Sequence, residues 1–376
     1  MSVTTADTAP KPKIWNDPFW RGLIFQGALL VVVLFLFAGA VINARNNMQA
    51  RGIPTDFAFW DRPASFDINQ TLIPYISQTL IEYSSSASTY GRAFWVGLLN
   101  PLLVAVLGIF FSTILGFAIG AARLSSSWLV AKLSAVYVEL VRNVPLLPQI
   151  IFWYNVVLGN LPNPRQAAPF FDIAFLSNRG LFVPAPVFKQ GSNAVWIALG
   201  LGIVGALIFR AWASNRQKAT GQQAPVGWVS AALVIGLPLL TFFSSGRPIG
   251  LDFPQLKGFN FVGGQRLTPE FVALLLALTL YTAAFIAEIV RSGILAVAKG
   301  QSEAAAALGL RAGPTRKLVI MPQAMRVIIP PLINQYLNIT KNSTLAVAIG
   351  YPDLFNVFSG TVLNNTGAAV QIVFMT

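Results

Sequence analysis

The 376-residue chain contains no cysteine and no histidine. Their absence excludes disulfide scaffolds, thiolate nucleophiles, zinc sites built from Cys and His, and haem ligation by His. Charge is also scarce: Asp, Glu, Lys and Arg make up 10% of the chain, against about 25% in soluble domains. Because 55% of the residues are hydrophobic and the mean hydropathy is +0.63, the composition indicates a protein that crosses a membrane several times.

A phosphate-binding loop is missing as well. None of the nine lysines follows the pattern Gly-x-x-x-x-Gly-Lys-Ser/Thr, so we expect no ATP site and no cofactor in this chain. The run Gly200-x-Gly202-x-x-Gly205 has dinucleotide-fingerprint spacing, but it lies inside an apolar helical segment, and we reject that reading. The net charge of +13 comes from residues spread through loops, which is typical of orientation in a membrane rather than of nucleic-acid binding.

Seven apolar segments are long enough to cross a bilayer, which takes roughly 20 helical residues. They are residues 22–44, 93–122, 128–159, 192–212, 227–245, 269–291 and 322–340. Another apolar run begins at Asn365 but reaches Thr376 after only twelve residues. We therefore expect the natural protein to continue through an eighth span.

Three of these spans have local features that shape them. Gly116-x-x-x-Gly120 in the second span predicts a close approach of another helix. In the third span, Pro145 and Pro148 remove backbone donors and clash with the preceding turn, so we expect the helix to kink or open there. We expect the seventh span to bend at Pro330-Pro331.

A polar, alanine-rich segment separates the sixth span from the seventh. The run after Ser302 predicts a helix of about eight residues, with Ser302 as N-cap and Glu303 at the positive end of the helix dipole. Gly309 and the Gly313-Pro314 pair should end it. A charged mini-helix between two membrane helices is typical of a docking element, since it is too short to be stable alone.

This segment also carries a family resemblance. Glu303, Ala304, Ala305, Gly309 and Pro322 stand at the spacing of the EAA loop of ABC importer permeases, with Val319 and Met321 replacing its Ile and Leu. RNVPLLPQ and ITKNSTLAVAIG resemble the polar amino acid permease subfamily, and the extra spans resemble the larger permeases of general L-amino-acid importers. The resemblance implies an all-α, type I ABC importer permease fold with about eight transmembrane helices, the last incomplete here.

The resemblance also implies an organisation of the chain. Residues 1–21 would be a cytoplasmic tail, 22–44 the first transmembrane helix and 45–91 a periplasmic loop region. Residues 92–376 would be the permease core, with extra helices at 192–245 and the cytoplasmic EAA loop at 292–321. Charge agrees: residues 291–326 hold six basic residues and one acid, whereas 43–92 hold four of each.

The partners are implied in the same way. Residues 301–312 would lie in a groove of a separate ATPase that binds the ATP and Mg, through Glu303, Ala304, Ala305, Leu308 and Gly309. The assembly would contain a second related permease, as a heterodimer, two ATPase subunits and a periplasmic amino-acid-binding protein. It would lie in a bacterial inner membrane with this chain's N-terminus in the cytoplasm.

Charged residues inside the spans allow two readings. Glu139 and Arg142, and likewise Glu288 and Arg291, stand three apart on one helix face. As internal ion pairs they would fix helix packing, the reading we favour for Glu288 and Arg291. In the other reading, Arg142 or Lys341 meets a substrate carboxylate beside backbone amides that open at 143–148 and 342–344; both readings stay open for Arg142. That pathway set is Arg142, Asn143, Pro145, Lys341, Asn342, Ser343 and Thr344.

Two functions from other classes compete with the ABC permease. An ion-driven secondary transporter could use Glu139 and Glu288 as proton carriers beside a broken helix. A membrane scaffold without a pathway would keep the charges at 139–142 dry and fully paired. The EAA loop favours the ABC permease, but the sequence specifies neither the transported amino acid nor a homo- or heterodimer.

Overall fold

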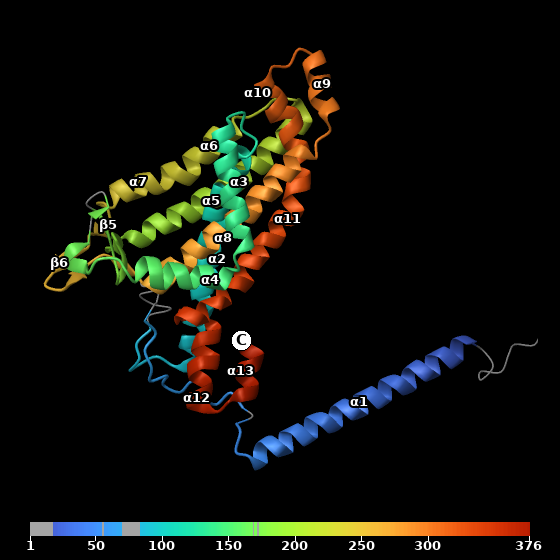
Figure 1. Cartoon of the computed structure of the whole chain (residues 1–376), viewed down its shortest axis with the longest axis vertical. Helices are drawn as coiled ribbons and strands as arrows, with labels where there is room; N and C mark the ends of the chain where they lie inside the picture. Colours follow the sequence, from blue (N-terminus) through green and yellow to red (C-terminus); the bar gives the residue numbers. More distant parts are fainter. Residues whose placement is uncertain (1–17, 55, 70–82, 168, 171–172) are drawn as a thin grey trace, which may run out of the picture. The chain divides into compact units, whose positions relative to one another are not determined.

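The computed structural model describes residues 18–54, 56–69, 83–167, 169–170 and 173–376 (Figure 1). The chain divides into two compact units, one made of residues up to 62 together with 359–376, the other of residues 63–358. Most of the predicted 1–21 tail lies outside the described residues. The predicted loop region at 45–91 has turns in described parts of the chain, at 51–54, 56–69 and 83–89.

The smaller unit contains one long apolar helix and two short ones. Helix α1 (Pro18–Ala50) has 33 residues and extends beyond the predicted 22–44 at both ends. The short helices are α12 (Leu363–Thr366) and α13 (Ala369–Met375). The Gln371 side-chain amide donates to the carbonyls of Pro54 and Asp56 at 3.1 and 3.0 Å. These bonds hold α13 to the segment that follows α1.

The larger unit is mainly helical. Its α-helices are α2 (Tyr90–Ala122), α3 (Trp128–Asn143), α4 (Leu146–Ile151), α5 (Ser192–Thr220), α6 (Val226–Ala231), α7 (Leu237–Ser244), α8 (Pro269–Leu295), α9 (Lys299–Ala307), α10 (Ala312–Pro314) and α11 (Met321–Asn342). Its π-helices are η2 (Phe152–Leu158), η4 (Ala232–Gly236) and η5 (Thr315–Ile320), and its 3-10 helices are η3 (Pro164–Gln166) and η6 (Ser343–Ile349). A further π-helix, η7 (Asn356–Val362), has residues in both units.

Helix α8 is the centre of this unit. Half of its most apolar stretch is buried, against 28% for α2, and α2, α3, α4, η2, α11 and η6 all pack on it. The predicted close approach at Gly116 and Gly120 is confirmed, because α8 fills the space beside both. A β-carbon at Gly116 would lie 2.6 Å from the Ile286 side chain, and one at Gly120 would lie 2.8 Å from Val290.

The predicted break in the third span is also confirmed. Helix α3 ends at Asn143, Val144 and Pro145 are extended, and the chain continues as α4 and η2 after a bend of 106°. The Gln149 amide donates to the carbonyls of Val141 and Val144, both at 2.9 Å. These two bonds satisfy carbonyls that the broken helix leaves without intrahelical partners.

The seventh span corresponds to helix α11, which follows the π-helix η5 and continues through Pro330-Pro331 without an interruption. The bend that we expected at these prolines stays a prediction. Among the described residues, five helices are long and apolar enough to cross a membrane, or six with the bent α3–η2 pair counted. Helix α11 is not in that set because Gln, Asn and basic residues make it less apolar.

The added helices form a hairpin of their own. Helix α5 packs against α6, η4 and α7, which run on from one another. A β-carbon at Gly202 would lie 2.3 Å from the carbonyl oxygen of Leu233, and one at Gly205 would lie 3.6 Å from the Leu233 side chain. Gly202 and Gly205 therefore serve helix packing, in agreement with our rejection of a dinucleotide site.

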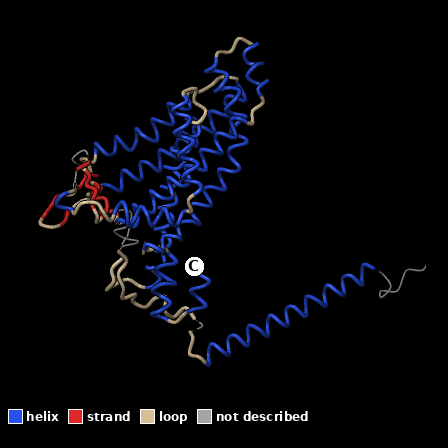
Figure 2. Tube along the Cα trace, viewed as in Figure 1, coloured by secondary structure: helices blue, strands red, loops and turns tan. Residues whose placement is uncertain are grey.

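Eight short strands were not predicted from the sequence. They gather at one end of the helices, opposite α9 and α10 (Figures 1 and 2). The strands are β1 (Pro169–Phe170), β2 (Ala174–Ser177), β3 (Gly180–Val183), β4 (Ala185–Phe188), β5 (Ile249–Asp252), β6 (Gln255–Lys257), β7 (Asn260–Val262) and β8 (Gln265–Leu267). They form an antiparallel sheet β1-β2-β3-β8 and the pairs β4-β5 and β6-β7. In this sheet, Leu181 pairs with Leu267.

Candidate functional site

Helix α9 is the predicted mini-helix, but it begins earlier than expected. It starts at Lys299 after Ala298, so Ser302 is not its N-cap and Glu303 is its fifth residue. The Ser302 hydroxyl donates to the Lys299 carbonyl at 3.0 Å, as serine does inside helices. Gly313 and Pro314 do not end α9; they belong to the next helix, α10.

Gly309 ends α9, as predicted, through its backbone conformation. Its φ of +77° lies in the left-handed region that side chains with a β-carbon disfavour. The amide of Leu310 donates to the Ala305 carbonyl at 3.1 Å, and the amide of Gly309 donates to the Ala306 carbonyl at 2.9 Å. This pattern is a Schellman cap, which satisfies the free carbonyls at a helix end. Nothing in the chain lies within 4 Å of where a Gly309 β-carbon would be.

The exposed surface of α9 has polar residues in its first half (Lys299, Gln301, Ser302 and Glu303) and small or apolar residues after them. Glu303, Ala304 and Leu308 are exposed, and Leu308 is 82% exposed. Ala305, which we expected to face a partner, is buried within the chain. The Gln323 amide donates to the Gln301 side-chain oxygen at 3.0 Å and thereby joins α9 to the start of α11. No local sequence pattern pointed to this glutamine pair.

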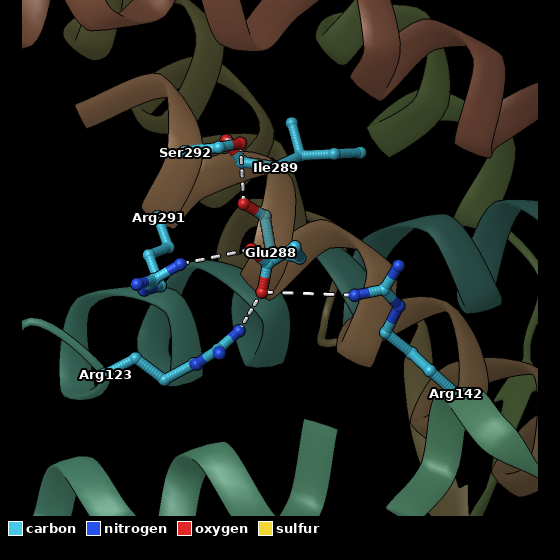
Figure 3. Close-up of polar contacts among 6 residues, drawn as sticks. All are labelled: Arg123, Arg142, Glu288, Ile289, Arg291 and Ser292. Carbon is cyan, nitrogen blue, oxygen red and sulfur yellow. Dashed lines mark hydrogen bonds and ion pairs between the residues drawn. The ribbon is translucent and has the colours of Figure 1, made fainter. Parts of the chain in front are cut away.

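A second cluster centres on the Glu288 carboxylate of α8, which three arginines approach (Figure 3). Arg123, at the end of α2, forms a hydrogen-bonded ion pair with Glu288. Arg291, one turn further along α8, lies 3.2 Å from the carboxylate, and Arg142 of α3 lies 4.0 Å from it. The cluster therefore connects three helices.

The expected ion pairs are confirmed in one case and wrong in the other. Glu288 and Arg291 pair as predicted. Arg142, however, turns to Glu288 and lies 5.1 Å from the Phe285 ring, whereas Glu139 is exposed on α3 and has no ion-pair partner among the described residues. Helix spacing alone cannot distinguish these cases, because α8 supplies a better partner for Arg142 than its own helix does. Arg123, which closes the second span in the sequence, was missed as a member of the cluster.

The cluster has more positive than negative charge. Three guanidinium groups meet one carboxylate, which leaves a formal excess of two positive charges. The Arg123 side chain is 11% exposed and is enclosed by the pair, while the Arg142 side chain is 40% exposed. Guanidinium groups present several donors in a planar fork that fits carboxylates. Arg142 is thus a fixed cation with donors left for another anion.

The predicted pathway segment at 341–344 is helical, and its backbone is hydrogen-bonded within the helix. Helix α11 passes directly into η6, and the Ser343 amide donates to the Ile339 carbonyl. The hydroxyls of Ser343 and Thr344 bond back to the carbonyls of Thr340 and Lys341. The expectation of open amides at 342–344 is therefore wrong, because the helix tightens where we expected it to open. Lys341 itself is exposed.

The structure does bring the two predicted pathway segments together through apolar contacts. Helix α4, which follows the break at Pro145, packs against η6. Leu146 and Ile150 of α4 and Ala346 and Ile349 of η6 share one buried cluster with Phe271 of α8. Within the described residues, no group of three acids could hold a metal ion.

Comparisons with known proteins point to one family. The family model described as "Binding-protein-dependent transport system inner membrane component" matches residues 226–376. The permease protein YhdX of Escherichia coli (strain K12) is 50% identical over 360 residues, which is 96% of this chain and 89% of YhdX. The general L-amino acid transport system permease protein AapQ of Rhizobium johnstonii is 49% identical over 95% of this chain and 87% of AapQ. The glutamate/glutamine/aspartate/asparagine transport system permease protein BztB of Rhodobacter capsulatus is 42% identical over 96% of this chain and 89% of BztB.

Proposed function

This chain belongs to the family of amino-acid ABC transporter permeases, and from that membership we propose that it is the translocation subunit of an importer of polar L-amino acids. It is an inner-membrane transport component with the type I permease fold and several membrane-spanning helices, rather than a catalyst. Its relatives are named for amino-acid transport, and the family description names a dependence on binding proteins.

The proposed assembly has partners on both sides of the membrane. ATP hydrolysis would belong to two ATPase subunits in the cytoplasm, a second related permease would complete the pathway, and a soluble binding protein would deliver the amino acid outside. The N-terminus of this chain would lie in the cytoplasm, on the same side as α9. The basic residues flanking α9 support this orientation.

The single observation that carries the coupling role is the geometry of α9. A short helix with Glu303, Ala304 and Leu308 at its surface, ended sharply at Gly309, fits a shallow groove on a partner. The chain buries few of that helix's own side chains, since Ala305 is its one buried residue. Leu308 would be the apolar anchor and Glu303 would pair with a basic residue of the ATPase.

In the pathway, Arg142 is the proposed partner of the substrate carboxylate. Its guanidinium is held beside the break in α3 by Glu288 and Phe285, yet remains partly exposed. Lys341, with Asn342, Ser343 and Thr344, is the second candidate and lies at the far end of α11. Alternating access would then move substrate past α3 and α4.

Reconstituted uptake tests this proposal. The complex purified through a tag on this chain should contain ATPase subunits, and in proteoliposomes it should take up radiolabelled polar L-amino acids only with ATP and a loaded binding protein. Ionophores that collapse proton and sodium gradients should leave that uptake unchanged. Uptake that required an ion gradient and no ATP would support the ion-driven alternative, for which neither the family model nor the relatives give support.

A further inference from the structure

Two insertions, residues 160–191 and 245–268, form a single β module at the end of the helices opposite α9 (Figure 2). Strand β3 from the first insertion pairs with β8 from the second, and β4 pairs with β5. A small aromatic core holds the parts together: the Phe261 ring lies 4.5 Å from that of Phe175 and 4.8 Å from that of Phe182. The module is thus a defined structure with a fixed surface.

The charge of this module runs against the usual pattern of membrane proteins. The two insertions contain six basic residues and two acids. Loops on the outer side normally carry few lysines and arginines, because positive charge favours retention in the cytoplasm. In the proposed orientation the module lies outside, so its six basic residues oppose that tendency. A function of the surface is the physical reason for keeping them there.

One part of the module presents charge and apolar area together. The β6–β7 hairpin (Gln255–Val262) turns at Gly258 and Phe259, and its Phe259 side chain is 71% exposed. The Arg165 guanidinium lies 3.7 Å from the centre of the Phe259 ring, and its Nε donates to the Gly258 carbonyl at 3.0 Å. Lys257 and Leu256 are exposed in the adjoining strand.

These contacts hold the hairpin surface in one arrangement before anything binds. Arginine and aromatic side chains that are already fixed lose little entropy on binding, and they dominate the energetics of many interfaces. The positive charge of Arg165 and Lys257 requires an acidic partner, and the exposed Phe259 and Leu256 require an apolar patch within it.

We propose that the β6–β7 hairpin together with Arg165 is a docking surface for the acidic face of the soluble amino-acid-binding protein. This inference rests on the proposed function, and it specifies where on this chain that partner binds. An anionic lipid headgroup would also attract Arg165 and Lys257. The protein is favoured because the guanidinium is stacked on the phenyl face, so inserting Phe259 into the bilayer would bring the Arg165 charge with it, which would be costly.

The test is uptake by the reconstituted complex, titrated with its purified, amino-acid-loaded binding protein. Lys257→Glu should raise the concentration of binding protein for half-maximal uptake about tenfold, and the salt dependence of that concentration should become flatter. Phe259→Ala should raise it by a similar factor while the salt dependence is kept. Lys189→Glu is the matched control, an exposed lysine of the same module at the end of β4, and it should leave the titration unchanged.

The outcomes separate this inference from the proposed function. Wild-type complex that shows no binding-protein-dependent uptake would overturn the proposed function itself. If wild type is active and both hairpin variants titrate like it, or if Lys189→Glu is as harmful as Lys257→Glu, the docking surface is not the hairpin. If the Lys257→Glu effect disappears in vesicles made only of zwitterionic lipid, the surface binds lipid instead. Maximal uptake equal to that of wild type shows that the variants are folded.

Discussion

Glu288 can neutralise only one of the three guanidinium groups around it, so each arginine has a different weight. Arg123 is mostly enclosed and directly bonded, whereas Arg142 is partly exposed and lies 4.0 Å away. Enclosed charges contribute mainly to stability, because removing the arginine takes from the carboxylate the partner that is directly bonded to it. Exposed charges with free donors are available to bind other groups.

Because of this difference, we expect one alanine substitution to affect uptake and the other to affect stability. Arg142→Ala should lower uptake at least tenfold and leave the amount of assembled complex unchanged, since it removes a carboxylate partner. Arg123→Ala should lower the free energy of unfolding by about 1 to 3 kcal/mol, since it breaks a largely enclosed ion pair. Thermal unfolding in detergent and uptake in proteoliposomes measure the two effects. If Arg142→Ala affected only stability, Arg142 would be a packing residue, and Lys341→Ala would then test the second candidate.

The buried Asp353, which lies outside the spanning helices, should make the stability of the protein depend on pH. It lies between η6 and η7 and is 1% exposed, and burial raises the pKa of its carboxyl to about 6, although the Asn356 amide donates to it at 2.7 Å. The folded state therefore favours the protonated carboxyl. Its contribution to stability is complete below about pH 4 and falls by about 3 kcal/mol as the pH rises through about 6.

Asp353→Asn should remove this dependence, because the amide keeps the acceptor for Asn356 and carries no charge. Melting temperatures of the solubilised protein between pH 4.5 and 7 should fall with rising pH for wild type and stay level for the variant. Parallel curves for the two proteins would show that Asp353 does not titrate in this range.

At the scale of elements, the proposed role of α9 in coupling depends on the cap at Gly309 that ends the helix. Gly309→Val should abolish coupled uptake while the protein stays in the membrane, because a β-branched residue at φ of +77° is strained and the cap would unwind. Gly309→Asn separates two explanations: asparagine tolerates the left-handed conformation, so activity should be largely kept if conformation is what matters. Loss of uptake with Asn as well would indicate instead that the partner approaches the Gly309 backbone closely.

Charge on α9 gives an independent test. Glu303→Lys should reduce substrate-stimulated ATP hydrolysis strongly, since it replaces an attractive contact with repulsion. Lys317→Ala, in the neighbouring η5, should be mild and serves as control. Full coupled uptake by both Glu303→Lys and Gly309→Val would mean that α9 does not transmit the ATPase cycle.

The contact of α2 with α8 predicts a matched pair of glycine substitutions. Gly116→Ala should destabilise the protein by about 1 to 3 kcal/mol, because the new methyl group would lie 2.6 Å from Ile286. Gly200→Ala, in α5, has nothing within 4 Å and should be neutral or slightly stabilising through helix propensity. Thermal unfolding of both variants checks this; equal melting temperatures would mean that α2 and α8 can separate at no cost.

The spanning helices could be predicted because length and apolarity are local properties of the sequence. The break at Pro145 and the cap at Gly309 followed from the chemistry of single residues. The strands could not be predicted, because they have two to four residues and β3 pairs with β8 across the intervening helices α5, α6, η4 and α7. For the same reason the ion pair of Arg142 with Glu288 of α8 could not be predicted. The pairing of the strands and the partner of Arg142 depend on contacts between residues far apart in the chain, and local sequence patterns do not reveal such contacts.

At the scale of the larger unit, the two proposed binding surfaces lie at opposite ends of the same helices (Figure 1). Helix α9 follows α8 and is joined to the start of α11 through Gln301 and Gln323. Helix α8 runs from the β module, where β8 precedes it, to α9. A rigid, buried helix of this kind is a physical route by which binding at one end can influence the other.

The pairing of β3 with β8 also has a consequence for biosynthesis. Leu181 can pair with Leu267 only after the ribosome has added 86 more residues, so formation of this strand pair is delayed by between about 4 and about 17 s. During that interval α5 and the α6–α7 segment both have to enter the bilayer. If only one of them entered, β8 would emerge on the wrong side of the membrane, and the edge of β3 would stay unpaired. Pairing of β3 with β8 is therefore possible only when the preceding helices have been inserted in the correct topology. In a chain with the wrong topology, the unpaired edge of β3 would be exposed to quality-control proteases.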